Sequence, residues 1–214
     1  MNNNQQETKW SENVMLVDAD YVDKVAFNLI VNFERMLGRR IPQADLARWI
    51  DCVALDGGLR PLSPTDSSYQ SGEQTLETLV VLVHRKDKTR LENFVPADYA
   101  NELDGKAFKD HLGEFLISAV AIEPIADGED YFQEALQLVT AQKEVKRVMV
   151  IPNAEDATIY NKVRATLNRI DDDEKRITVF AMEPQPGGNF RQELLGYSLM
   201  AALGIRSEEL KKMS

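Results

Sequence analysis

The residues best suited to chemistry in this sequence are five carboxylates that follow predicted buried strands. They are Asp18, Asp20, Asp130, Glu155 and Asp156. Asp18 and Asp20 are two residues apart, so in an extended chain their side chains project to the same side. Two carboxylates held close together repel each other, and a divalent cation relieves that repulsion. Because hard oxygen ligands suit Mg²⁺ and Mn²⁺, we predict a site for one of these ions, with Asp18 and Asp20 as the catalytic pair.

Helix capping is the competing explanation for the same carboxylates. Asp20 or Asp23 can cap the helix after the first strand, because the N-terminus of a helix favours negative charge. Asn153, Glu155 and Asp156 can likewise cap the helix after the fourth strand. The sequence leaves capping and metal binding open for both groups.

Basic residues gather after the second predicted strand, in a chain that is acidic overall. They are Arg85, Lys86, Lys88 and Arg90. We predict that these side chains contact the phosphates of RNA. The alternative is a solvated loop in which Asp87 balances the charge. The stretch Gly-Gly-Asn at 187–189 could also offer backbone N–H groups to an anion, but it matches no complete phosphate-loop pattern, which favours a plain linker.

Apolar runs predict the strands that position these residues. The runs cover residues 14–17, 78–84, 115–122, 147–151 and 176–182. Helical spacing predicts helices over residues 22–37, 42–57, 97–103, 107–112, 132–139, 159–167 and 190–203. Because the strands alternate with helices, we predict an α/β fold, a three-layer α/β/α sandwich with a mostly parallel five-stranded sheet. Ligands of such sheets bind beyond the carboxyl ends of the strands.

The order of elements over residues 14–182 resembles that of the PIN-like nucleases, in particular their NYN branch. Asp18 matches the family's metal-binding carboxylate at the end of strand one, and Asp20 lies beside it. Asp130 matches the acidic residue that opens the helix after strand three. The resemblance implies a PIN/Rossmann-like fold and Mg²⁺- or Mn²⁺-dependent hydrolysis of RNA, for which short single strands are the expected substrate.

The fourth strand departs from that family's pattern. The family has Ser-Gly-Asp-x-Asp-Phe there, whereas this chain has Pro-Asn-Ala-Glu-Asp at 152–156, so Glu155 and Asp156 are the available substitutes. A relative that kept the fold and lost the reaction is therefore an open alternative. The whole chain also resembles an uncharacterised bacterial family.

A second enzymatic alternative comes from residues 18–22. Their sequence, Asp-Ala-Asp-Tyr-Val, fits the D-x-D-x-[T/V] signature of the haloacid-dehalogenase-like phosphatases. In that family the first Asp is the nucleophile and the second is the general acid. Three features disfavour this alternative: the helix begins almost at once, no Ser or Thr follows the second strand at the expected place, and no Lys motif precedes the late acidic cluster.

A third alternative is a non-enzymatic module that forms oligomers or binds a partner. The predicted helix Phe190–Leu203 carries a broad apolar stripe with several small residues. This stripe can pack on the chain's own sheet, which we favour, or on a second subunit. A scaffold of this kind would need no active site.

Composition limits the classes of function. Lys+Arg 25 against Asp+Glu 35 gives 25 − 35 = −10, a charge that disfavours anionic membranes and long nucleic acid but not a short RNA. The single cysteine, Cys52, excludes a disulfide framework, and the two histidines, His84 and His111, leave little for an imidazole-rich metal site.

The expected organisation is a single domain without a targeting or membrane segment. Residues 1–13 predict a disordered lead-in, residues 14–205 the α/β domain with a polar loop at 59–74, and residues 206–214 a tail. Because no apolar leader or spanning stretch is visible, we predict a cytoplasmic protein.

Overall fold

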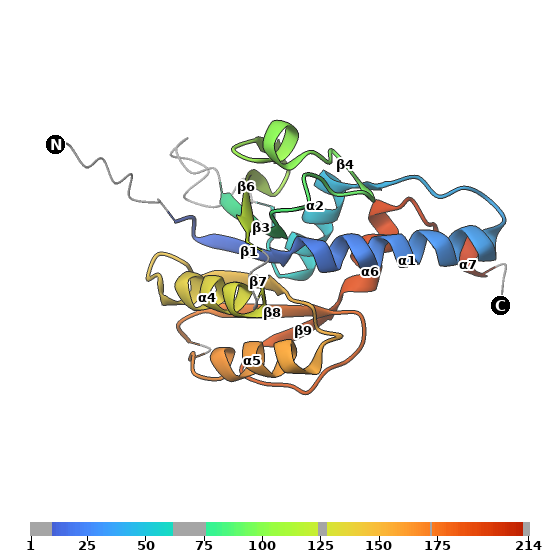
Figure 1. The fold of residues 1–214 in the computed structure, drawn as a ribbon. Coiled ribbons are helices and arrows are strands. Elements are labelled where there is room, and N and C mark those ends of the chain that lie inside the picture. Colours follow the sequence, from blue (N-terminus) through green and yellow to red (C-terminus); the bar gives the residue numbers. More distant parts are fainter. Residues whose placement is uncertain (1–9, 62–75, 124–127, 172, 212–214) are drawn as a thin grey trace.

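The structure is a computed structural model that describes residues 10–61, 76–123, 128–171 and 173–211 (Figure 1). The strands are β1 (Asn13–Asp18), β2 (Ala44–Asp45), β3 (Glu77–Arg85), β4 (Phe94–Val95), β5 (Ala107–Asp110), β6 (Gly113–Ile122), β7 (Arg147–Ile151), β8 (Arg176–Ala181) and β9 (Arg191–Leu194). The helices are α1 (Ala19–Leu37), α2 (Leu46–Asp56), the π-helix η1 (Tyr99–Leu103), α4 (Gly128–Ala141), α5 (Ala157–Leu167), α6 (Leu195–Ala202) and α7 (Ser207–Lys211).

The described part of the chain forms a seven-stranded sheet in the order β5-β6-β3-β1-β7-β8-β9. All neighbouring strands are parallel except β5, which pairs antiparallel with β6. The short strands β2 and β4 pair with each other in a separate sheet. The predicted α/β class with a mostly parallel sheet is therefore confirmed.

Helices pack on both faces of this sheet, because the strands are apolar on both sides. On one face, Met15 and Val17 of β1 join the core with α1, α2 and α6. On the other face, Val14 and Leu16 join a second core with α4 and α5. Figure 1 shows α4 and α5 together on one side of the strands, away from α1 and α6. All four of these β1 side chains are at most 1% exposed, which explains the continuous apolar run.

The predicted count of five strands is wrong, because two polar strands lie at the edges of the sheet. Residues 107–112, predicted as a helical piece, form β5 and its turn. The predicted helix 190–203 begins instead as strand β9 and becomes helical only at Leu195. An edge strand has a neighbour on one side only, so it does not need the apolar run by which we recognised strands.

The chain termini and the polar loop are described only in part. The loop predicted at 59–74 lies outside the described residues from position 62 onward, and the predicted lead-in lies outside them up to position 9. Within the lead-in, the Ser11 hydroxyl donates to the Glu77 carboxylate at 2.5 Å. Within the predicted tail, the Arg39 guanidinium forms two hydrogen bonds with the Glu209 carboxylate of α7, at 2.8 and 2.9 Å.

The apolar stripe of α6 faces the interior of the same chain. Leu195, Ser198, Leu199 and Ala202 are buried, and α6 packs against α2 and β8. Tyr197, by contrast, is 66% exposed. Oligomerisation through this helix stays a prediction. None of the helices in the described part of the chain is long and apolar enough to cross a membrane.

Candidate functional site

The order of the strands reverses at β1, and in a sheet of this kind a ligand-binding crevice is expected between the carboxyl ends of β1 and β7. Counted along the chain, the six parallel strands lie in the order 3-2-1-4-5-6. In such doubly wound sheets ligands bind where the order reverses, because the crossovers on either side leave toward opposite faces. Asp18 is the last residue of β1, and Ile151 ends β7 beside it. Asp18, the first of the predicted carboxylates, therefore lies at the point where the strand order reverses.

Asp18 is both the N-cap of α1 and a partly buried carboxylate. Its Oδ1 accepts the Tyr21 backbone N–H at 3.0 Å, which satisfies one of the free N–H groups at the start of the helix. Burial, with a smaller contribution from the Asp20 carboxylate, raises the pKa of Asp18 to about 6, although the Tyr21 hydrogen bond and Lys88 act to lower it. Asp18 therefore caps α1 and also carries a carboxyl group whose charged form is disfavoured by burial.

Asp20 lies in the first turn of α1 and faces the end of β3. Its Oδ2 accepts the Arg85 backbone N–H at 3.0 Å, which joins α1 to β3. Its Oδ1 is buried and lies 3.3 Å from the Lys88 ammonium, in an ion pair whose alignment does not meet that of a hydrogen bond. The Arg85 guanidinium lies further away, at 3.7 Å from Oδ2.

Tyr21 and Glu155 connect the end of β1 with the loop after β7. The Tyr21 hydroxyl is buried and has no hydrogen-bond partner of ordinary geometry. Burial raises the pKa of Tyr21, and the carboxylates of Glu155 and Asp18 raise it further. Both carboxylates therefore act on the same hydroxyl, although Asp18 ends β1 and Glu155 lies in the loop after β7. An aromatic residue in an amphipathic helix predicts core packing, so no sequence signal indicates a role for Tyr21 at this site.

A stacked aromatic pair lies at the carboxyl end of β3. The rings of His84 and Tyr99 lie 3.7 Å apart and nearly parallel, at 8°. The Nδ1 of His84 lies 3.0 Å from the Arg85 carbonyl, which can only accept, so Nδ1 carries a proton. Burial raises the pKa of Tyr99, and the nearby carboxylates Asp20, Asp23 and Asp18 raise it further. The two residues lie far apart in the sequence, which offers no signal for this contact.

Asp23 fixes the loop that carries the basic residues. It is 6% exposed and accepts the Asn93 backbone N–H at 2.8 Å, while the Asn93 amide donates to the Asp23 carbonyl at 3.2 Å. Asp23 is therefore a structural link between α1 and the segment after β3, and it does not cap α1.

The structure gives less support to Asp156 and Asp130 as metal ligands. Asp156 is the N-cap of α5, accepting the N–H groups of Thr158 and Ile159 at 2.8 and 3.2 Å. Asp130 lies in the first turn of α4, and its side chain is outside the described part of the structure. Among the described residues, Asp18, Asp20, Glu155 and Asp156 do not supply three carboxylates within 4.8 Å of one another.

The predicted phosphate-binding residues are each paired with a carboxylate. Arg85 lies 3.2 Å from Asp87 as well as close to Asp20, and Lys86 contacts Glu123. Lys88 contacts Asp20, and Arg90 lies 4.0 Å from Glu92. These pairs are exposed for the most part and contribute little to stability, so a phosphate could compete for the basic side chains. Their contact with RNA stays a prediction.

Replacing Lys88 by Met is expected to raise the pKa of Asp18 above its value of about 6. The Lys88 ammonium lowers that pKa in the natural chain, because positive charge favours the carboxylate. Carboxyl carbon shifts followed by NMR as a function of pH would measure the change. Lys109→Met, which removes an exposed cation from β5, is the matched control. An unchanged Asp18 titration would contradict the contact between Lys88 and the crevice.

A second group of possible ligands lies away from the crossover, between α2 and the β5–β6 turn. Ligand atoms of Asp51, Asp110 and His111 lie within 4.8 Å of one another. Burial and the Asp110 carboxyl group raise the pKa of Asp51, while His111 lowers it. One Asp110 oxygen accepts the Leu112 N–H at 2.7 Å, which shapes the turn. His111 belongs to the stretch 107–112 that the sequence predicts to be helical, but it lies exposed in the turn after β5.

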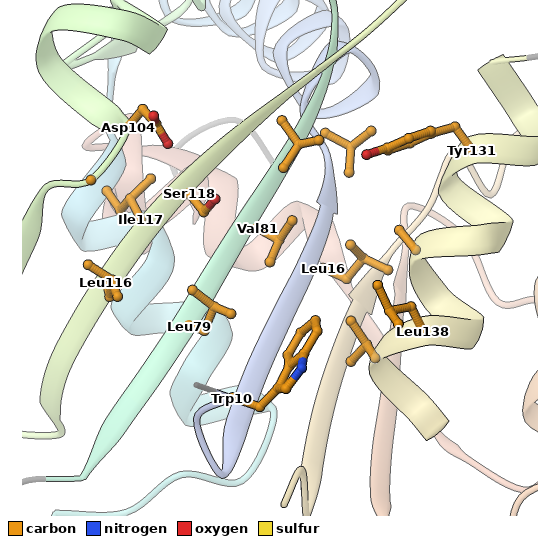
Figure 2. A pocket seen from close by; sticks show the side chains of 15 residues that line it. Trp10, Leu16, Leu79, Val81, Asp104, Leu116, Ile117, Ser118, Tyr131 and Leu138 are labelled. Atoms are coloured by element: carbon orange, nitrogen blue, oxygen red, sulfur yellow. The ribbon is translucent and has the colours of Figure 1, made fainter. Parts of the chain in front are cut away.

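Two cavities lie near the carboxyl ends and on the α4 face. The first, of about 280 Å³, is lined by Glu155, Glu183 and neighbours that follow β7 and β8. The second, of about 560 Å³, lies between α4 and strands β1, β3 and β6. Figure 2 shows that its labelled side chains are mostly apolar, with Asp104 and Ser118 at one end and Trp10 at the other. The Asp104 carboxylate already accepts the Ala119 N–H at 2.9 Å.

The fold is that of a doubly wound α/β protein, with the carboxylates of Asp18 and Asp20 where its strand order reverses. The chain belongs to a family of unknown function, DUF6621, whose sequence profile matches residues 7–210. No curated protein and no solved structure matches it.

Proposed function

We propose that the crevice between β1 and β7 binds Mg²⁺ or Mn²⁺ and hydrolyses phosphodiester bonds in short single-stranded RNA. The observation that carries the proposal is the position of Asp18, which ends the central strand where the strand order reverses and has the Asp20 carboxylate nearby. Helices on both faces of the sheet agree with a three-layer, PIN/Rossmann-like interpretation of the fold.

The residues of the crevice fit a Mg²⁺-type ion. Such an ion commonly takes only one or two protein carboxylates and completes its shell with water and substrate phosphate. Asp18 and Asp20 supply two carboxylates, and Glu155, in the loop after β7, does not complete a cluster of three with them. A cation here would favour the ionised form of Asp18, which burial and Asp20 now disfavour. When bound, the ion would supply Lewis-acid activation of the phosphodiester.

The other residues of the crevice would position the ligands and the substrate. The Tyr21 N–H holds one oxygen of Asp18 at 3.0 Å and leaves the second oxygen for the ion. The Arg85 N–H holds Asp20 in the same way. Lys88 neutralises Asp20 and, once an ion takes over that role, is placed to contact a phosphate.

The test is cleavage of end-labelled single-stranded RNA by the purified chain. We expect cleavage with Mn²⁺ and none with excess EDTA. A generic phosphomonoester assayed in parallel separates the nuclease from the phosphatase alternative, since turnover of that substrate alone would favour the latter. If no RNA is cleaved with either Mn²⁺ or Mg²⁺, the nuclease proposal is wrong and the chain has the fold without the reaction.

A further inference from the structure

We propose that the amino ends of β7, β8 and β9 form a binding site for a small anion that carries a diphosphate group. A cavity of about 320 Å³ lies there, lined by the basic residues Arg147, Lys175, Arg176 and Arg191, of which Lys175 donates its ammonium to the Gln142 and Val145 carbonyls. Of the residues that the structure describes, no Asp or Glu lines this cavity. In a chain of net charge −10 such a concentration of positive charge is unexpected. The site is separate from the Asp18 crevice and does not depend on its function.

The register of the sheet brings three of these arginines onto one face. Arg147 and Arg176 are direct partners on the neighbouring parallel strands β7 and β8. Arg191 is the partner of Thr178, which lies two residues after Arg176 and points to the same side. Neighbouring strands are about 4.8 Å apart, and like charges that face each other at this spacing destabilise a sheet. An anion bound among them would remove that penalty.

Arg147 is held in a fixed position close to other positively charged side chains. Its Nη1 donates to the Gly57 carbonyl at 2.7 Å, which fixes the guanidinium at the end of α2. Burial lowers the pKa of Arg147, and the charges of Arg176, Arg60 and Arg191 lower it further. A preformed cation that cannot move away from its like-charged neighbours is a suitable anchor for an anion.

The carboxylates in the neighbourhood do not neutralise the cavity. Glu193 accepts a hydrogen bond from Arg191 at 2.7 Å, and Glu12 acts electrostatically on Arg147. The backbone N–H of Arg176 donates to the Lys146 carbonyl at 2.8 Å, whereas its guanidinium has no hydrogen bond or ion pair within the described part of the chain. Its guanidinium donors are therefore available to a ligand.

The chemistry of the lining favours phosphate over other anions. Guanidinium groups bind phosphate oxygens through paired hydrogen bonds, and several of them suit a group of high charge density such as a diphosphate. The volume falls at the lower end of the range for small-molecule pockets, about 300–1,000 Å³. Phe190 adds an aromatic surface on which a base could stack. The diphosphate can therefore come from inorganic pyrophosphate or from a nucleoside diphosphate.

Calorimetric titration of the full chain with pyrophosphate and with adenosine diphosphate, in metal-free buffer, tests the proposal. We expect one pyrophosphate per chain, with Arg176→Gln and Arg191→Gln each weakening binding by about tenfold or more, because each removes a charge-assisted contact. Arg35→Gln, which removes an exposed cation at the end of α1, should leave binding unchanged. Asp18→Asn should also leave it unchanged, which separates this site from the crevice.

Two outcomes distinguish a nucleoside diphosphate from free pyrophosphate as the ligand, and a third would contradict the proposal. Tighter binding of adenosine diphosphate than of pyrophosphate, with only the former weakened by Phe190→Leu, identifies the nucleotide. Equal affinities that Phe190→Leu does not change identify free pyrophosphate. If neither compound binds, or if the Arg176 and Arg191 variants bind pyrophosphate like the natural chain, the site does not exist.

Discussion

In metal-free buffer at pH 7, Asp18→Asn is expected to be more stable than the natural chain by about 3 kcal/mol. The pKa of Asp18 rises from 3.8 to about 6 on folding, and each unit corresponds to about 1.36 kcal/mol. Asparagine has no charge to desolvate and is as good an N-cap as aspartate. The variant therefore keeps the cap on α1 and removes the cost of a buried carboxylate.

The pH dependence of this gain has a defined sign. Between pH 3.8 and about 6 the folded chain holds a proton on Asp18 that the unfolded chain has lost. Stability from this group is thus fully present below pH 3.8 and is lost as the pH rises through 6. Urea unfolding at pH 4 and at pH 7 measures the effect, and the gain should appear at pH 7 only. Asp45→Asn, at the exposed N-cap of α2, is the control in which no gain is expected. Equal stability of Asp18→Asn and the natural chain at pH 7 would contradict the buried carboxylate.

The same substitution is expected to reduce Mn²⁺-dependent RNA cleavage by at least about 100-fold. A catalytic metal stabilises the transition state by several kcal/mol, and Asp18 is the central ligand of the proposed site. Initial rates of cleavage at saturating Mn²⁺ give the comparison. A loss of activity together with a gain in stability cannot be explained by misfolding, which is why this variant is more informative than an alanine substitution.

Asp45→Asn again provides the matched control for the activity. It removes the same charge from another helix N-cap, outside the crevice, and should cleave RNA at the natural rate. Cleavage by Asp18→Asn at the natural rate would mean that the activity arises at another site.

The central strands were predictable because each is buried on both faces. The apolar runs at 14–17, 78–84, 115–122 and 147–151 fall within β1, β3, β6 and β7. The stop of α1 was also visible: Gly38 adopts a positive φ of 63° and donates its N–H to the Glu34 carbonyl at 3.0 Å. In both cases a local pattern of residues determines the structure.

The two edge strands and the basic cavity were not predictable in this way. The sequences of β5 and β9 are Ala-Phe-Lys-Asp and Arg-Gln-Glu-Leu, whose polar residues suit the solvent side of an edge. Arg147, Arg176 and Arg191 meet only through the register of β7, β8 and β9. Each of them alone is an ordinary polar residue at the start of a strand.

The candidate metal site could be predicted from the sequence only in part. The sequence pattern indicates that the candidate carboxylates follow three of the predicted strands, but which of them meet depends on the strand order and on competing contacts. Asp156 is occupied by capping α5, whereas Asp18 caps α1 and also lies at the crossover. Tyr99 lies near Asp18 and Asp20, and the Arg85 N–H donates to Asp20, through contacts between separate segments that no local pattern encodes.

Direct measurement of Mn²⁺ binding tests the central claim, that the crossover of β1 and β7 holds a divalent cation. The electron paramagnetic resonance signal of free Mn²⁺ falls as the ion binds, so a titration gives the number of sites and their affinity. We expect one site per chain that Asp18→Asn removes and that Asp51→Asn, in the other acidic cluster, leaves intact. Equal binding by Asp18→Asn and the natural chain, or a site lost only in Asp51→Asn, would contradict the account.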